Sequence, residues 1–167
     1  MYFCQCQAGF AAKKSIFPIL SSRIGSDKIA IYFYNLTSIF MTEYDTLKGL
    51  RHSEQLVVEH KDTAAVYGSG ALEVFATPAM IALMEKTCLM GVCDKVGEGN
   101  TTVGIAVNIK HLKASPVGAT IRCEAELVEV DRRRLVFAVK CFEGDTLIGE
   151  GIHERFVVES AKFMAKL

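Results

Sequence analysis

A hydroxyl, a carboxylate and an imidazole are the three side chains of this sequence whose chemistry would fit together. Thr77 and Glu85 lie in an apolar segment that starts after Phe75-Ala76, and His111 ends an alternating segment that starts at Val103. A carboxylate in apolar surroundings costs several kcal/mol unless a partner or a function compensates for it. The three groups suit acyl transfer, because an imidazole can move protons near neutral pH and a carboxylate can serve as a base.

Each of these residues also has a purely structural explanation. Thr77, directly before Pro78, fits the N-cap of a helix, where a hydroxyl accepts a hydrogen bond from a free amide. Glu85 could reach solvent or pair with Lys86 or with an arginine of a neighbouring strand, and His111 could be an ordinary histidine near a strand end. The sequence leaves open whether Thr77 is a nucleophile or a positioning group, and whether Glu85 is a base or a nucleophile.

The surrounding segments predict the elements that must position these side chains. Residues 55–66 are typical of a strand, and Thr77-Pro78 starts a helix that ends near Cys93. Apolar residues surround the axis of this helix, which predicts burial on most sides. Four further strands are expected over residues 102–112, 119–130, 135–142 and 147–158, the first of them with one packed face.

This order of elements predicts an α+β fold, in which a five-stranded antiparallel sheet with a four-strand meander curls around one long central helix. The free edges of such a sheet favour pairing across a two-fold axis, so we expect a homodimer. At about 1.5 Å per residue, Thr77 and Glu85 lie roughly 12 Å apart along the helix. We therefore expect active sites at the subunit interface, where the glutamate of one chain faces the threonine of the other.

The composition limits the class of protein. Half of the 167 residues are hydrophobic, enough for one domain, which we assign to residues 41–167. Residues 1–40 are expected to be an N-terminal extension that is either not native or poorly packed, with Met41 as a candidate start of translation. Nineteen basic and nineteen acidic side chains balance, and no apolar stretch is long enough for a bilayer, so we expect neither nucleic acid nor membrane as a partner. The six cysteines lack zinc or disulfide-scaffold spacing, which favours a cytoplasmic protein with no metal.

Three segments together resemble the fluoroacetyl-CoA thioesterase branch of the hotdog-fold superfamily: residues 74–88, residues 104–118 and the run Gly151-Ile152-His153-Glu154-Arg155. The resemblance implies a hotdog fold and an acyl-CoA thioesterase that hydrolyses a short or small acyl-CoA to free acid and CoA. It implies catalytic roles for Thr77, Glu85 and His111, and it places Gly104 close to the acyl group. His153 is expected to support the fold or the site. No cofactor is implied, since coenzyme A is part of the substrate.

Substrate contacts are expected at two further places. The specialised fluoroacetyl enzyme carries a phenylalanine gate shortly before the threonine, where this chain has Ala71-Leu72, so the acyl group stays open. We expect Ala71, Leu72 and Phe75 to contact the substrate. Arg132 and Arg133, in a basic turn, are candidates for the CoA phosphates, because no phosphate-binding loop motif is present. An acyl-CoA hydratase or dehydratase and a non-catalytic acyl-CoA-binding module are the alternatives on this fold.

Overall fold

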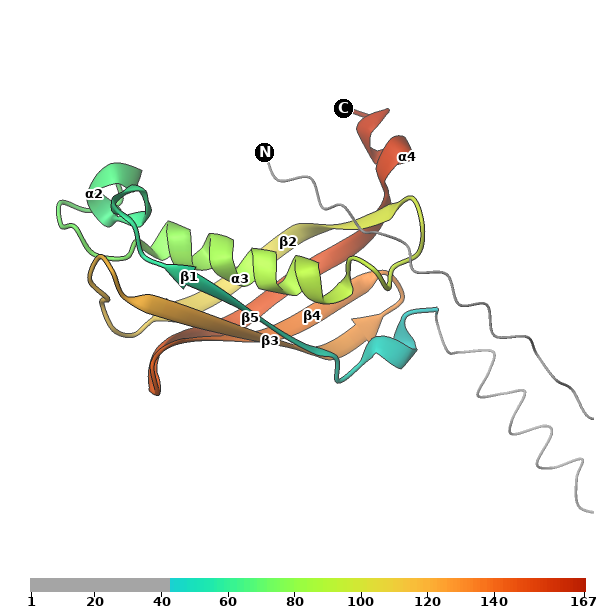
Figure 1. Ribbon diagram of the computed structural model, residues 1–167. Coiled ribbons are helices and arrows are strands. Elements are labelled where there is room, and N and C mark those ends of the chain that lie inside the picture. Colours follow the sequence, from blue (N-terminus) through green and yellow to red (C-terminus); the bar gives the residue numbers. More distant parts are fainter. Residues whose placement is uncertain (1–42) are drawn as a thin grey trace, which may run out of the picture. The chain divides into compact units, whose positions relative to one another are not determined.

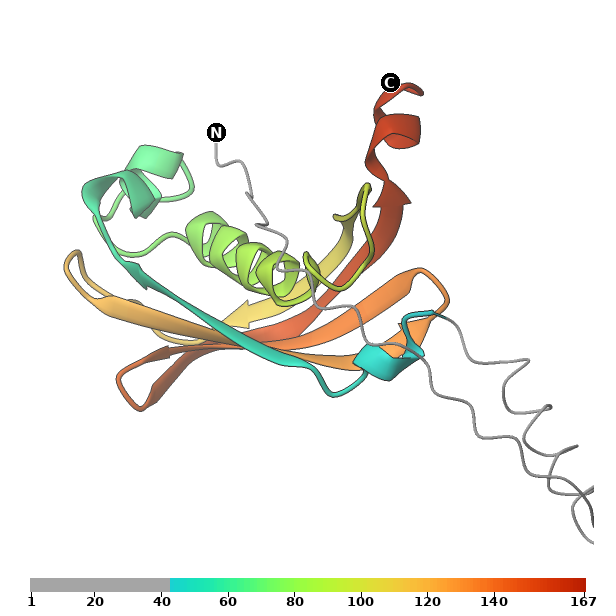
Figure 2. The same ribbon diagram turned by 45° about the vertical axis from the view of Figure 1, so that its right-hand side comes forward.

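The computed structural model describes residues 43–167; the expected extension and Met41 lie outside the described residues. Its main elements are β1 (Arg51–Val57), α3 (Thr77–Val92), β2 (Asn100–His111), β3 (Thr120–Asp131), β4 (Arg134–Glu143) and β5 (Thr146–Glu159). Four short helices accompany them: η1 (Asp45–Leu47), η2 (His60–Asp62), α2 (Ala64–Tyr67) and α4 (Ser160–Met164). The five strands form one antiparallel sheet that curves around α3 (Figures 1 and 2), so the expected α+β architecture is confirmed.

Helix α3 is buried on several sides against the inner face of the sheet. Met80, Met84 and Cys88 on the helix are at most 1% exposed, as are Leu127 and Leu135 on the strands below them. Fully burying a side chain of this size stabilises the fold by roughly 1.5–3 kcal/mol. The helix is therefore fixed in position and direction, together with the functional side chains that it carries.

The order of the strands differs from the predicted meander. The sheet runs β1-β3-β4-β5-β2, so β2 pairs with β5 at the far edge and does not pair with β3. Residues 112–119 carry the chain across from β2 to β3, and the bridge between Val74 and Pro116 and the bond from the Gly118 amide to the Val58 carbonyl hold this crossing. The prediction of four consecutive neighbours was wrong because alternation shows a strand but not its partner.

The first strand also differs from its prediction, since β1 covers residues 51–57 and not residues 55–66. Glu59 and Asp62 form a reciprocal capping box that begins η2, and the Thr63 hydroxyl accepts a hydrogen bond from the Val66 amide at the start of α2. These side-chain caps turn the chain out of the sheet. The other four strands lie within two residues of their predicted ranges, and α3 ends at Val92 with Cys93 as its C-cap.

The middle of β2 does not have the packed face that its alternation predicted. The pairing with β5 shifts between Gly104 and Ala106, which leaves Ile105 as an extra residue in a β-bulge. Ile105 and Val107 are 53% and 41% exposed, because β2 has a neighbouring strand on one side only. No helix within residues 43–167 has the length and apolar character needed to cross a membrane.

Gly151→Ala tests how tightly β5 lies against β2. A Cβ at Gly151 would lie 2.6 Å from the Ile109 Cα and would also strike the Asn108 carbonyl, so the β2 backbone must move. We expect a loss of about 1–3 kcal/mol in the free energy of unfolding, measured by urea denaturation. Gly70→Ala is the control, since its Cβ would meet only the Ala64 Cβ, at 3.3 Å. Equal unfolding midpoints for the two variants would contradict this packing.

Candidate active site

Thr77 and His111 meet at the N-terminal end of α3. The Thr77 hydroxyl lies 2.9 Å from Nδ1 of His111, the last residue of β2. Ala76 is the N-cap of α3 and Thr77 is the first helical residue, so the prediction that Thr77 caps the helix was wrong. The Thr77 hydroxyl is hydrogen-bonded to the His111 imidazole and not to a backbone amide of the helix.

The surroundings of His111 favour its neutral form. The ring makes an edge contact with Phe75 at a centroid distance of 6.3 Å, and Nε2 is buried with no hydrogen-bond partner among residues 43–167. Burial lowers the pKa of His111, and the nearby backbone of Lys113 opposes this only in part. A neutral ring with Nδ1 directed at a hydroxyl can accept the hydroxyl proton, which is the arrangement that activates an alcohol.

The pair lies in a surface hollow of about 380 Å³, called here the threonine hollow. Its walls are Ala64, Ser69, Val74, Phe75, Thr77, His111, Leu112, Lys113 and Ala114. The structure thus brings three predicted residues together: Thr77, His111 and Phe75. Ala71 and Leu72 are exposed in the loop before α3, where the Leu72 carbonyl accepts a hydrogen bond from the Ala65 amide.

Two buried polar residues hold the segment that leads into Thr77. The Phe75 amide donates to the Ser115 carbonyl at 2.8 Å, and the Ala76 amide donates to the Asp62 carbonyl at 2.9 Å. The Ser115 hydroxyl, fully buried, donates to the Glu143 carboxylate at 2.8 Å. Sequence reasoning missed these two residues, because a polar residue in a loop or a short helical turn carries no signal of burial.

Glu85 lies apart from this pair, two turns further along α3. Its side chain is 42% exposed and therefore only partly buried, and Oε1 lies 3.8 Å from Nε2 of His153. Gly104 gives the carboxylate its room, since a Cβ there would come within 2.8 Å of Oε1. Lys86 is not the partner of Glu85, because its ammonium pairs with Glu54 at 2.9 Å.

A buried histidine and a buried arginine support the region around Glu85. His153 is 1% exposed; its Nδ1 faces the Ala106 carbonyl at 2.9 Å, and its Nε2 faces the Arg155 guanidinium at 3.1 Å. Nδ1 therefore carries the hydrogen and Nε2 accepts one. Arg155 also donates to the hydroxyl and the carbonyl of Thr102, both at 2.8 Å, and to the Glu85 carbonyl at 3.4 Å. The sequence marked the motif that contains Arg155 but gave this arginine no role.

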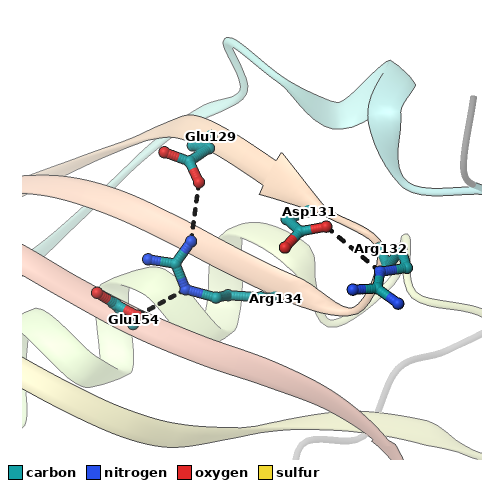
Figure 3. A network of polar contacts seen from close by, with 5 residues as sticks. All are labelled: Glu129, Asp131, Arg132, Arg134 and Glu154. Carbon is teal, nitrogen blue, oxygen red and sulfur yellow. Dashed lines mark hydrogen bonds and ion pairs between the residues drawn. The ribbon is translucent and has the colours of Figure 1, made fainter.

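Arg132 and Arg133 occupy the turn between β3 and β4, at the opposite end of β4 from Glu143 and Ser115. The Arg132 guanidinium is directed at Asp131, with Nε 3.4 Å from Oδ1, and it is 83% exposed (Figure 3). Arg134 is held between Glu129 and Glu154 (Figure 3). The ten residues of β4 span about 30 Å, so in one chain this turn is far from the threonine hollow.

Thiol and metal chemistry find little support around these residues. Cys88 lies under Glu85 and Arg155, but burial raises the pKa of its thiol far above neutrality, which leaves it protonated and a poor nucleophile. Within residues 43–167, no three His, Cys, Asp or Glu side chains are grouped to hold a metal ion.

The partly buried His111 and the buried His153 should make the fold sensitive to acid. Burial lowers the pKa of His111 and of His153 below the usual 6.5, so near and below pH 6.5 the unfolded chain binds more protons than the folded chain. The free energy of unfolding should therefore be retained above pH 6.5 and fall as the pH falls below it. NMR titration of the two imidazole rings, in buffer and in urea, measures whether their pKa values are lower in the folded state than in the unfolded state. A folded-state pKa of His111 at or above its urea value would contradict the argument.

Two solved structures are similar to this chain over most of its length. A variant of the fluoroacetyl-CoA-specific thioesterase FlK, solved with fluoroacetate and CoA, is 34% identical; the match covers 70% of this chain and 98% of that one, with a TM-score of 0.66. A hot-dog-like protein from Thermanaerovibrio acidaminovorans is 20% identical over 74% of this chain and 93% of that one, with a TM-score of 0.68. This second likeness is one of fold, and the expected hotdog fold is confirmed.

Sequence comparison leads to the same family. The fluoroacetyl-CoA thioesterase of Streptantibioticus cattleyicolor is 40% identical over 95 residues, which make up 57% of this chain and 68% of that protein. The sequence profile described as fluoroacetyl-CoA-specific thioesterase matches residues 58–161, which include Thr77, Glu85, Gly104 and His111. With the hotdog fold and these matches in place, the chain belongs to the fluoroacetyl-CoA-specific thioesterase family.

Proposed function

We propose that this thioesterase hydrolyses a small acyl-CoA to free acid and CoA in a homodimer, with Thr77 and His111 from one protomer and Glu85 from the other at each active site. The observation that carries the proposal is the 2.9 Å contact between the Thr77 hydroxyl and Nδ1 of His111, a ring that burial keeps neutral. Ala71 and Leu72 precede the threonine where the specialised enzyme has its gate, so the acyl group need not be fluoroacetyl.

The geometry supports Thr77 as the nucleophile. Its oxygen attacks the thioester carbonyl while Nδ1 of His111 takes the hydroxyl proton, and the first turn of α3 stabilises the oxyanion. The C–S bond then breaks, and the imidazolium returns the proton to the leaving thiolate. Water hydrolyses the threonine ester to release the acid and restore the hydroxyl, with the Glu85 carboxylate as its base.

The rigidity of α3 supports a site shared by two chains. Eight residues at 1.5 Å each keep Thr77 and Glu85 of one chain about 12 Å apart, and each has its own neighbours: His111 beside Thr77, and His153 beside Glu85. The group that removes a proton from the attacking water must reach the acyl group bound at Thr77. The Glu85 carboxylate of a second chain can meet this requirement.

The free edge of β2 supports a suitable two-fold axis. Along β2, Glu85 lies beside Gly104 and Thr77 lies beside His111. The point of the strand halfway between these two positions is near Val107 and Asn108. Antiparallel pairing of two β2 edges about this midpoint would bring each Glu85 to the level of the other chain's Thr77. It would also cover Val107 and Ile105, which are exposed in the single chain.

Two further features belong to the proposal. The reaction uses only side chains and water, so coenzyme A takes part as substrate and no resident cofactor is required. We propose that the enzyme is cytoplasmic, where thiols stay reduced; Cys88, Cys123 and Cys141 form no disulfide in the structure.

Thiol release from a panel of acyl-CoA esters, acetyl-CoA and fluoroacetyl-CoA among them, tests the catalytic assignment. Glu85→Ala, His111→Ala and Thr77→Val should each lower kcat by about 10²–10⁴-fold, while Thr77→Ser keeps a hydroxyl and should retain part of the activity. Lys86→Ala is the control, because it removes a charge next to Glu85 that pairs with Glu54. Binding of an ester without thiol release by the wild type would favour a non-catalytic acyl-CoA-binding module.

Mixed dimers test the shared site. Thr77→Ala and Glu85→Ala chains are unfolded and refolded together, so that half of the dimers contain one chain of each kind and one intact site. We expect about one quarter of the wild-type activity to return. Mixing either variant with the double variant cannot rebuild a site and should stay inactive. No recovery in the first mixture, or a monomeric variant with full activity, would place each site within one chain.

A further inference from the structure

Lys113 is the charged residue at the rim of the threonine hollow. It follows His111 by two positions, it is exposed, and it makes no ion pair with any of residues 43–167. With His111 neutral, Lys113 supplies the only full charge among the nine residues of the wall. Its ammonium is on a flexible stem and can meet an anion outside the hollow.

Several other charged side chains near this end of the fold have partners of their own. His60 lies 3.4 Å from Glu73, Lys61 pairs with Glu59, and Glu143 accepts the Ser115 hydroxyl. An anion that arrives at the threonine hollow therefore finds one uncommitted cation on its wall. Leu112, 51% exposed beside Lys113, adds apolar surface to the same rim.

The shape of the substrate decides which anion this is. In an acyl-CoA the thioester is joined by the pantetheine arm to a nucleotide that carries all the phosphates. With the thioester carbonyl at Thr77, the arm must leave through the open side of the hollow, so the phosphates lie outside it. Arg132 and Arg133 of the same chain lie about 30 Å away, at the far end of β4.

We propose that Lys113 binds the phosphate groups of coenzyme A at the mouth of the threonine hollow and so determines the preference for CoA esters over thioesters that lack phosphates. The proposal rests on the placement of the thioester at Thr77. The contact acts on substrate binding and leaves the chemical step unchanged, because Lys113 does not reach the thioester when it holds the phosphates. Lys113 is thus a specificity residue for the CoA part of the substrate.

The test compares ligands with and without phosphates. Lys113→Ala should weaken the binding of free CoA in calorimetry, and should raise KM for acetyl-CoA, by about three- to tenfold, with kcat unchanged and a smaller effect at high salt. S-acetyl pantetheine has the same acyl group and arm without the phosphates, and its KM should not change. Lys113→Arg should restore most of the CoA binding. Lys110→Ala is the matched control, since Lys110 is an exposed lysine on β2 outside the wall of the hollow.

Three results would overturn the proposal. Unchanged binding of CoA by the Lys113→Ala variant would contradict the proposal directly. Equal loss for acetyl-CoA and S-acetyl pantetheine would assign Lys113 to the arm or the acyl group. The third result is a weaker binding of CoA, but not of S-acetyl pantetheine, in Arg132→Ala or Arg133→Ala and not in Lys113→Ala. This result would place the phosphates at the turn of a second chain. Calorimetry with CoA measures binding without turnover, so it tests Lys113 independently of hydrolysis. If the hydrolysis proposal fails, the wild-type protein will bind CoA but cleave neither ester.

Discussion

Burial of α3 against the inner face of the sheet is the interaction on which the rest of this structure depends. Met80, Met84, Cys88 and Val92 are at most 1% exposed, so the helix cannot slide or rotate without opening the core. This fixes where Thr77 and Glu85 emerge from the helix. Thr77 leaves the helix at its N-terminus, in reach of His111, and Glu85 leaves it beside Gly104 and His153.

The same constraint separates the proposed catalytic groups into two places. The threonine and histidine form a pair that can generate a nucleophile, and the Glu85 carboxylate lies separately beside His153, which Arg155 and the Ala106 carbonyl hold in place. The β-bulge after Gly104 lies between them, on a strand whose outer edge is unpaired and whose apolar side chains are exposed. In the proposed dimer, a second copy of the chain would complete both the sheet and the site.

Most of the fold could be predicted because its local signals agree. The helix start at Thr77-Pro78, the all-round apolar character of α3 and the alternation of the last four strands all gave elements within two residues of those observed. The errors lie where tertiary contacts decide. The first strand ends early because Glu59, Asp62 and Thr63 cap short helices, and β2 lies at the edge because the crossing at residues 112–119 is held by the Val58 and Val74 backbone.

For the site, the sequence by itself determined the candidate catalytic groups and the distance between two of them. A hydroxyl, a carboxylate and an imidazole are fixed by residue type, and the rise of a helix sets the separation of Thr77 and Glu85. Only the tertiary structure decided that the Thr77 hydroxyl faces His111 and does not cap the helix, that Arg155 supports His153, and that Lys113 is the charge at the rim of the threonine hollow. These contacts join residues far apart in the chain, and a contact of that kind depends on how the sheet closes around the helix, which no local pattern records.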